Sequence, residues 1–394
     1  MSLRSQSYFN KTVILIQQYH GVMPLVNYLK QYFAQNKKHG SKDRKFISHL
    51  CYCYYRLGHA LKDINIEERL KIAIFLCNDE AGEWIGLFDE TWLNNWSKDL
   101  NKRVEHIKLG YASFELEDIF PWKEELSEGI DSYDFSLSHM IQPDLFLRIR
   151  PGKEDAVTKK LKLNDITFRP ISASCLALPN GSKVDTILKV DEEVVIQDYS
   201  SQRIAESLKL ITPDLLPATQ VWDACAASGG KSILAIDLLP GIQLTVSDVR
   251  TSILQNLKAR FEKAGIKQYK SFITDLTTNP QIPVNDYRLI LCDAPCSGSG
   301  TWCRTPEHLY FFSPEKIEHY ADLQKKIVSN SIPHLATGGY FLYSTCSVFR
   351  KENEDIVSYI QQQFPSLKLV KQEVLNGYPC KADNMFVALF QKAG

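Results

Sequence analysis

The spacing of hydrophobic residues changes twice along the chain. In residues 1–125, apolar residues recur every three or four positions, which predicts a bundle of amphipathic helices. Between residues 145 and 197, short strand-like runs replace this pattern, with one helical segment at 154–161. From Thr219 onward, short apolar runs alternate with helical segments, as a doubly wound α/β sheet requires. The pattern therefore predicts helices first, then a small α/β region, then a larger α/β domain.

The domain boundaries are expected where these patterns change. An acidic, turn-rich stretch near residues 120–131 separates the helical pattern from the strand pattern. A chain of 394 residues also exceeds what one hydrophobic core usually serves. We therefore expect a helical domain at 1–128, a small α/β domain at 129–203 and an α/β domain at 204–394.

Two of the apolar runs in the last domain lead into a cysteine. Leu289–Cys292 continues into Asp293 and Cys296, and Tyr340–Tyr343 continues into Cys346. In open α/β sheets, ligands bind outside the carboxyl ends of the strands, so these side chains are expected at a binding site. A free cysteine is also often a small buried hydrophobic residue, and this second interpretation applies to any one of them taken alone.

A third stretch, residues 221–232, has the features of a cofactor loop. A strand start is followed by small residues and then by Lys231 at the beginning of an apolar helix. The P-loop motif would need a glycine where Cys225 stands, and no G-x-G-x-x-G is present. Asp248 and Asp275 each follow a later apolar run, in a position suited to ribose hydroxyls. A nucleoside cofactor without a pyrophosphate fits these features, and S-adenosylmethionine is such a cofactor. The candidate cofactor-binding residues are Cys225, Ala226, Ala227, Ser228, Gly229, Gly230, Lys231, Asp248, Arg250, Asp275 and Asp293.

Composition places the chain among ordinary soluble globular proteins. It is 44% hydrophobic and 23% charged, and no apolar stretch reaches 18 residues. Its ten cysteines form no C-x-x-C pair, so we expect a reduced, cytoplasmic protein without a bound metal. The formal net charge is zero, yet residues 1–62 hold ten basic residues and one acid, Asp43. Such a segment is either a solvated helix face or a surface for phosphates.

Three motifs together resemble those of one enzyme family. They are, in chain order, DACAASGGKS, DAPCSGSGTWCRTPE and YSTCSVFRKENE. Their order and spacing are similar to those of the Sun family, the RsmB-type RNA cytosine-5 methyltransferases. The resemblance implies a Rossmann-like methyltransferase domain that uses S-adenosylmethionine, preceded by a small α/β (RRM-like) domain and an all-helical, NusB-like, RNA-binding domain. The chain departs from the family at Ser228, where relatives usually have proline, and at 383–386.

The family resemblance also implies roles for the two cysteines and the aspartate. Carbon 5 of cytosine becomes nucleophilic when a thiolate adds to carbon 6 of the ring. By resemblance, Cys346 is this nucleophile, Cys296 helps to release the product, and Asp293 binds the cytosine edge. DNA cytosine methyltransferases use the cysteine of the Pro-Cys pair instead, so exchanged roles stay open. An adenine-N6 methyltransferase would need Pro-Pro and an aromatic residue after Asp293, which the chain lacks.

The expected partner is RNA, most of all ribosomal RNA of the 16S type. Arg148 and Arg150 lie on one face of a predicted strand, where they either pair with local acids or reach an RNA backbone. The candidate RNA-binding residues are Arg148, Arg150, Arg304, Lys42, Arg44 and Lys45. We expect a monomer without an obligate protein partner or membrane contact. The alternatives are a tRNA cytosine-5 methyltransferase and a non-catalytic RNA-binding factor in ribosome assembly.

Overall fold

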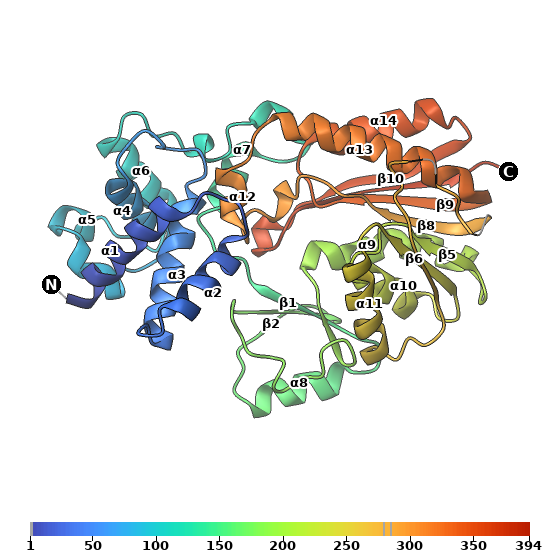
Figure 1. Cartoon of the computed structure of the whole chain (residues 1–394), viewed down its shortest axis with the longest axis horizontal. Helices are drawn as coiled ribbons and strands as arrows, with labels where there is room; N and C mark the ends of the chain where they lie inside the picture. The colour runs from blue at the N-terminus through green and yellow to red at the C-terminus, as the bar shows by residue number, and fades with distance from the viewer. Residues whose placement is uncertain (1–2, 279, 284–285) are drawn as a thin grey trace. The chain divides into compact units, whose positions relative to one another are not determined.

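The chain divides into two compact units in the computed structural model, which describes residues 3–278, 280–283 and 286–394 (Figure 1). The helical unit comprises residues up to Glu124, together with Asp131–Gln142 and Trp302–Ser313. The sheet unit comprises Glu125–Ile130, Pro143–Thr301 and Pro314–Gly394. The finer division into three domains stays a prediction.

The helical unit confirms the predicted N-terminal helical region. Its core includes Leu50, Leu70 and Tyr55, all nearly inaccessible to solvent. Arg69 is buried with them, and its guanidinium donates to the backbone carbonyls of Tyr54, Gly58 and Ala60. The helices of this unit are α1 (Leu3–Gln18), α2 (Leu25–Gln35), α3 (Ser41–Arg56), α4 (Ile66–Cys77), α5 (Glu90–Asn94), α6 (Leu100–Gly110), α7 (Ser132–Ser138) and α12 (Pro306–Tyr310).

The sheet unit contains a small antiparallel sheet with the strand order β2-β3-β1-β4. Its strands are β1 (Leu145–Ile149), β2 (Arg169–Ser172), β3 (Cys175–Leu178) and β4 (Val194–Ile196). Helix α8 (Glu154–Leu163) buries Val157 and Leu161 against Leu147 and Leu176 of this sheet. Strands and helix lie where the sequence pattern predicts them, and the likeness to an RRM stays a prediction.

The larger sheet has seven strands in the order β10-β11-β9-β8-β5-β6-β7. Five neighbouring strands are parallel, and β11 is antiparallel to both β9 and β10. This is the predicted α/β sheet with one reversed strand inserted near its edge. The strands are β5 (Gln220–Asp223), β6 (Gln243–Asp248), β7 (Lys270–Ile273), β8 (Tyr287–Asp293), β9 (Leu335–Thr345), β10 (Leu367–Leu375) and β11 (Met385–Lys392).

Helices cover both faces of the larger sheet. One apolar cluster joins the sheet to α9 (Tyr199–Ile211), α10 (Gly230–Leu238) and α11 (Thr251–Lys263). A second cluster, on the other face, joins it to α13 (Glu315–Ser331) and α14 (Glu354–Gln363). The carboxyl ends of β5, β6, β8 and β9 therefore share one edge of the sheet. All three sequence motifs begin at this edge. In the described part of the chain, no helix has the length and hydropathy needed to cross a membrane.

Candidate active site

The two cysteines predicted to be catalytic lie in contact. Strands β8 and β9 are parallel neighbours in which Asp293 is in register with Ser344, so the residues that follow each strand emerge side by side. The Sγ atoms of Cys296 and Cys346 are 3.3 Å apart, and both thiols are partly buried. Ser344 Oγ donates to Asp293 Oδ1 at 2.9 Å, which fixes the carboxylate beside them. The sheet thus brings together the three residues that the sequence assigns to catalysis.

The carboxylate of Asp293 has a second partner, the ammonium group of Lys231. Lys231 Nζ lies 2.6 Å from Asp293 Oδ2 and comes from the first turn of α10. Burial alone would lower the pKa of Lys231, but the ion pair with Asp293 outweighs burial and raises it. The pair keeps the lysine charged at neutral pH. Lys231 is therefore a link between the cofactor loop and the cysteine site.

A buried carboxylate ties the two cysteine loops to each other. Glu352 is fully buried, and its Oε2 accepts from the backbone N–H of Ser297 at 2.8 Å and from Gln324 Nε2 at 3.1 Å. Its Oε1 accepts from the hydroxyl of Ser347 at 2.8 Å. Ser347 Oγ lies 3.2 Å from the hydroxyls of both Ser297 and Ser299. Sequence reasoning missed this role because an acid at the end of the third motif is equally typical of a helix start.

The thiol of Cys296 has a perturbed pKa. Its contact with the Cys346 thiol, its burial and the nearby Glu352 carboxylate all raise the pKa of Cys296 well above its ordinary value. A thiol in this environment holds its proton at neutral pH.

The predicted cofactor loop connects β5 to α10 in an unusual backbone conformation. Ala227 and Gly229 both have positive φ, at 45° and 83°. A side chain at Gly229 would meet the ring of Phe261 at 2.7 Å, so this position needs glycine. The backbone N–H of Ala227 donates to Asp248 Oδ2 at 3.1 Å, which joins the loop to the end of β6.

Two neighbouring cavities surround this loop, with volumes of about 640 Å³ and 270 Å³. They share Cys225, Ala227 and Asp293 in their walls, and Cys296 and Cys346 line the larger one. The larger cavity alone is of a size that proteins use for nucleoside-sized ligands. The larger cavity is lined among others by Asp248, Arg250 and Asp275, and the smaller by Ala226, Ser228, Gly230 and Lys231. The residues predicted for S-adenosylmethionine thus fit such a ligand, with Gly229 acting through the backbone.

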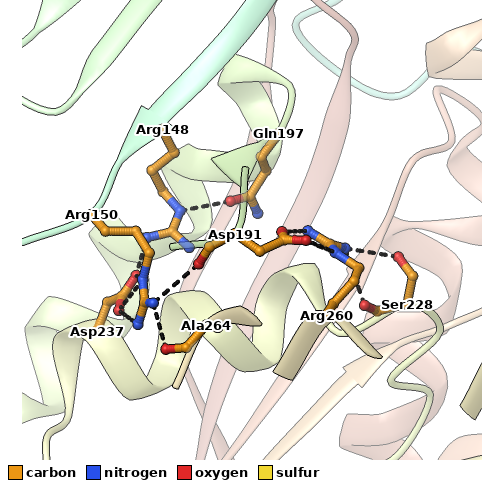
Figure 2. Close-up of polar contacts among 8 residues, drawn as sticks. All are labelled: Arg148, Arg150, Asp191, Gln197, Ser228, Asp237, Arg260 and Ala264. Atoms are coloured by element: carbon orange, nitrogen blue, oxygen red, sulfur yellow. Dashed lines mark hydrogen bonds and ion pairs between the residues drawn. The ribbon is translucent and has the colours of Figure 1, made fainter. Parts of the chain in front are cut away.

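The structure corrects the prediction that Arg148 and Arg150 bind RNA. Arg148 is only 4% exposed, and both guanidinium groups pair with Asp237 of α10 (Figure 2). Arg148 Nε also donates to Gln197 Oε1 at 2.8 Å, and Arg150 Nη1 donates to the carbonyl of Ala264. These groups cannot reach a phosphate without breaking buried ion pairs. They fasten the small sheet to the larger one instead.

The other predicted RNA-binding residues belong to the helical unit. Lys42, Arg44 and Lys45 are exposed on the first turns of α3. Lys42 pairs with Glu83 at 3.1 Å, and Arg44 Nε donates to the carbonyl of His39. Their contact with RNA, and that of the half-buried Arg304, stays a prediction.

Solved structures share this fold. The crystal structure of PH0851 superposes with a TM-score of 0.71 at 18% identity, and the match covers 100% of this chain and 99% of that one. NSun6 from Pyrococcus horikoshii superposes with a TM-score of 0.58 at 15% identity, covering 71% of this chain and 97% of that one. The chain shares the α/β fold of these structures, with a seven-stranded mixed sheet of the kind typical of methyltransferases.

The sequence of the sheet unit matches one family model. Residues 211–390 match the model described as 16S rRNA methyltransferase RsmB/F, a family whose cofactor is S-adenosylmethionine. The probable ribosomal RNA small subunit methyltransferase B of Bacillus subtilis is 27% identical over 255 residues, 62% of this chain and 56% of that protein. The ribosomal RNA small subunit methyltransferase B of Klebsiella pneumoniae is 30% identical over 298 residues, 70% of this chain and 65% of that protein. The chain thus spans roughly half to two thirds of the length of these relatives.

Proposed function

We propose that this protein is an S-adenosylmethionine-dependent RNA cytosine-5 methyltransferase that acts on 16S-type ribosomal RNA. The observation that carries the proposal is the contact of Cys296 and Cys346 beside Asp293, in the wall of a cavity that the cofactor loop also lines. Cytosine-5 chemistry needs a nucleophilic thiol, a group that binds the base edge and a group that handles the carbon 5 proton. The site supplies one candidate for each requirement.

In this mechanism Cys346 is the nucleophile. Its thiolate forms a bond to carbon 6 of cytosine, and the electron pair of the carbon 5–carbon 6 double bond is then available at carbon 5. Bound S-adenosylmethionine supplies the methyl group that carbon 5 takes up. Asp293, an anion paired with Lys231, accepts a hydrogen bond from the amino group of the base and so orients the ring. Loss of the carbon 5 proton and of the Cys346 thiolate then restores the double bond.

Cys296 acts at the release step. Its raised pKa supports a thiol that is protonated while Cys346, 3.3 Å away, attacks. Once Cys346 is bonded to carbon 6, Cys296 gives its proton to solvent and, as a thiolate, takes the carbon 5 proton, while the carbon 5–hydrogen electron pair restores the double bond and Cys346 leaves as a thiolate. Carbon 5 attack also requires the target cytosine to be unstacked, so an unpaired or flipped-out base is the expected substrate. The names of the relatives support ribosomal RNA as the substrate class.

The test is methylation of RNA from a strain that lacks this protein. The purified full chain is incubated with total RNA and methyl-labelled S-adenosylmethionine, and 5-methylcytosine is measured in separated RNA species. Wild type is compared with Cys346→Ala, Cys296→Ala and Cys380→Ala, a partly exposed cysteine of the sheet unit outside both cavities. We expect label in small-subunit ribosomal RNA with wild type and Cys380→Ala, and none with Cys346→Ala.

The adduct decides the roles of the two cysteines. Cys296→Ala should accumulate an RNA–protein adduct that survives denaturant. If the adduct forms with Cys346→Ala instead, the roles are exchanged. Label confined to tRNA would support the tRNA methyltransferase, and cofactor and RNA binding without any methylation would support the assembly factor.

A further inference from the structure

One arginine, Arg260, links the turn before β4 to the predicted cofactor loop. Asp191 in this turn is 3% exposed and has a φ of 69°, a conformation held by its N–H donating to the carbonyl of Val194 at 2.7 Å. Its carboxylate pairs with Arg260 of α11 in a two-pronged arrangement, with Arg260 Nη2 2.7 Å and Nε 3.0 Å from Oδ1 and Nε 3.1 Å from Oδ2 (Figure 2). Such fork geometry fixes the plane of the guanidinium.

The remaining arm of Arg260 contacts the loop. Arg260 Nη1 donates to both the carbonyl oxygen and the hydroxyl of Ser228, each at 3.0 Å (Figure 2). Ser228 stands between Ala227 and Gly229, the two residues with positive φ. A left-handed backbone at a residue with a side chain, such as Ala227, is unfavourable and persists only where its surroundings hold it. The chain Asp191–Arg260–Ser228 is one such restraint.

We propose that Arg260 and Asp191 are positioning residues for cofactor binding. Arg260 holds the loop at Ser228 in the conformation that lines the two cavities, and Asp191, from the small sheet, fixes Arg260. The small sheet would then act on cofactor affinity through Asp191, in addition to Ile196 of β4, which lines the smaller cavity together with Arg260. This inference rests on the proposed use of S-adenosylmethionine and adds the residues that prepare its site.

A matched control lies in the same contact between the two sheets. Arg150 pairs with Asp237 and donates to the backbone carbonyls of Ala264 and Asp191, so it also joins the small sheet to the larger one, but it has no bond to Ser228 or to the Asp191 carboxylate (Figure 2). A purely structural role of Arg260 would make Arg260→Gln and Arg150→Gln behave alike. A positioning role predicts that they differ.

The experiment measures cofactor binding and loop exchange in the full-length protein. Binding of S-adenosylhomocysteine is followed by calorimetry, and hydrogen exchange by mass spectrometry of peptides covering residues 224–232. We expect Arg260→Gln to weaken binding about tenfold and Asp191→Asn about threefold, since asparagine tolerates positive φ and keeps one of the two acceptor oxygens that face Arg260. Arg260→Lys, which keeps the charge but not the fork, should lie between wild type and Arg260→Gln. The double variant should be no weaker than Arg260→Gln, because both act through one chain of contacts.

Hydrogen exchange of the loop amides tests this inference independently of the proposed function. The amides of Ala227 and Gly229 are hydrogen-bonded, so they should exchange faster in Arg260→Gln and at the wild-type rate in Arg150→Gln. Wild-type protein that fails to bind S-adenosylhomocysteine would remove the proposed function, while faster exchange in Arg260→Gln would still support the restraint. Unchanged exchange and affinity in Arg260→Gln, or equal losses in Arg150→Gln, would overturn it.

Discussion

Replacing Glu352 tests whether hydrogen bonding or charge joins the two cysteine loops. The fully buried carboxylate accepts from the Ser297 N–H, the Gln324 amide and the Ser347 hydroxyl. Glu352→Ala removes all three acceptor contacts, which leaves the Ser297 N–H without a partner and the Gln324 amide with only the carbonyl of Pro295. Glu352→Gln keeps the size and one carbonyl oxygen for the two N–H donors, and the Ser347 hydroxyl can rotate to accept from the new amide.

The alanine variant should be the more damaging by a wide margin. A hydrogen bond to a charged group contributes about 1.5–3 kcal/mol, and an orphaned buried donor costs about 1–3 kcal/mol. Release from the cost of burying a carboxylate offsets part of this loss. We expect a net destabilisation of about 3 kcal/mol, which lowers the melting temperature of a unit of this size by about 6–12 °C.

The stability of Glu352→Gln should be close to that of wild type at neutral pH. The difference in stability between the two proteins should change with pH in a direction that the pKa of Glu352 determines. Burial raises the pKa of Glu352 above its ordinary value, despite the hydrogen bonds that lower it. A carboxyl with a raised folded-state pKa contributes most stability when protonated, and that contribution is lost as pH rises through the folded-state pKa. Wild type should therefore gain stability relative to Glu352→Gln as the solution is acidified from neutral pH toward 4.5.

Differential scanning calorimetry of the three proteins between pH 5 and pH 8 measures both effects. A glutamine variant that melts as low as the alanine variant would refute the reasoning, because the charge rather than the hydrogen bonds would then hold the loops. A difference between wild type and Glu352→Gln that does not change with pH would show that the carboxyl has no raised pKa in the folded protein.

Three further substitutions address the cofactor loop and the strand ends. Gly229→Ala forces a side chain into a φ of 83° and should abolish S-adenosylhomocysteine binding in calorimetry, whereas the control Gly110→Ala in α6, with no atom within 4 Å of the added Cβ, should bind like wild type. Burial raises the pKa of Asp223 to about 7, so wild type should lose melting temperature as pH rises through 7 and Asp223→Asn should lose less in the same scan. Lys231→Met leaves Asp293 without its cation and should lower the initial rate of 5-methylcytosine formation about tenfold or more, with binding of RNA unchanged in a filter assay.

The alternation of apolar runs and helical segments predicted most of the larger sheet, but not the direction of its strands. The spacing of apolar residues predicts which positions are buried and whether a segment is a helix or a strand. It does not predict strand direction, because the antiparallel pairing of β11 with β9 depends on the path by which the chain returns to the sheet. Strand β9 also begins at Leu335, earlier than the predicted start at Tyr340, because its pairing with β8 continues past Gly338 and Gly339 through an irregularity in register. Glycines inside a strand look like a boundary when only the sequence is available.

Some residues at the site could be found from the sequence, and others could not. Asp293, Cys296 and Cys346 follow apolar runs, so the rule that ligands meet strand ends found them. Asp191 and Arg260 lie in a turn and on a helix, where a charged residue is ordinarily solvated, and nothing local marks them as partners. Nothing local at Ser228 predicted its bonds with Arg260, because these contacts are tertiary.

The environment of the two thiols bears on which of them attacks the base. The two Sγ atoms lie 3.3 Å apart, so a negative charge on one sulfur disfavours ionisation of the other. The contact with the Cys346 thiol, burial and the nearby Glu352 carboxylate together raise the pKa of Cys296, so this thiol keeps its proton at neutral pH. A protonated Cys296 favours Cys346 as the nucleophile over the exchanged arrangement of the DNA enzymes.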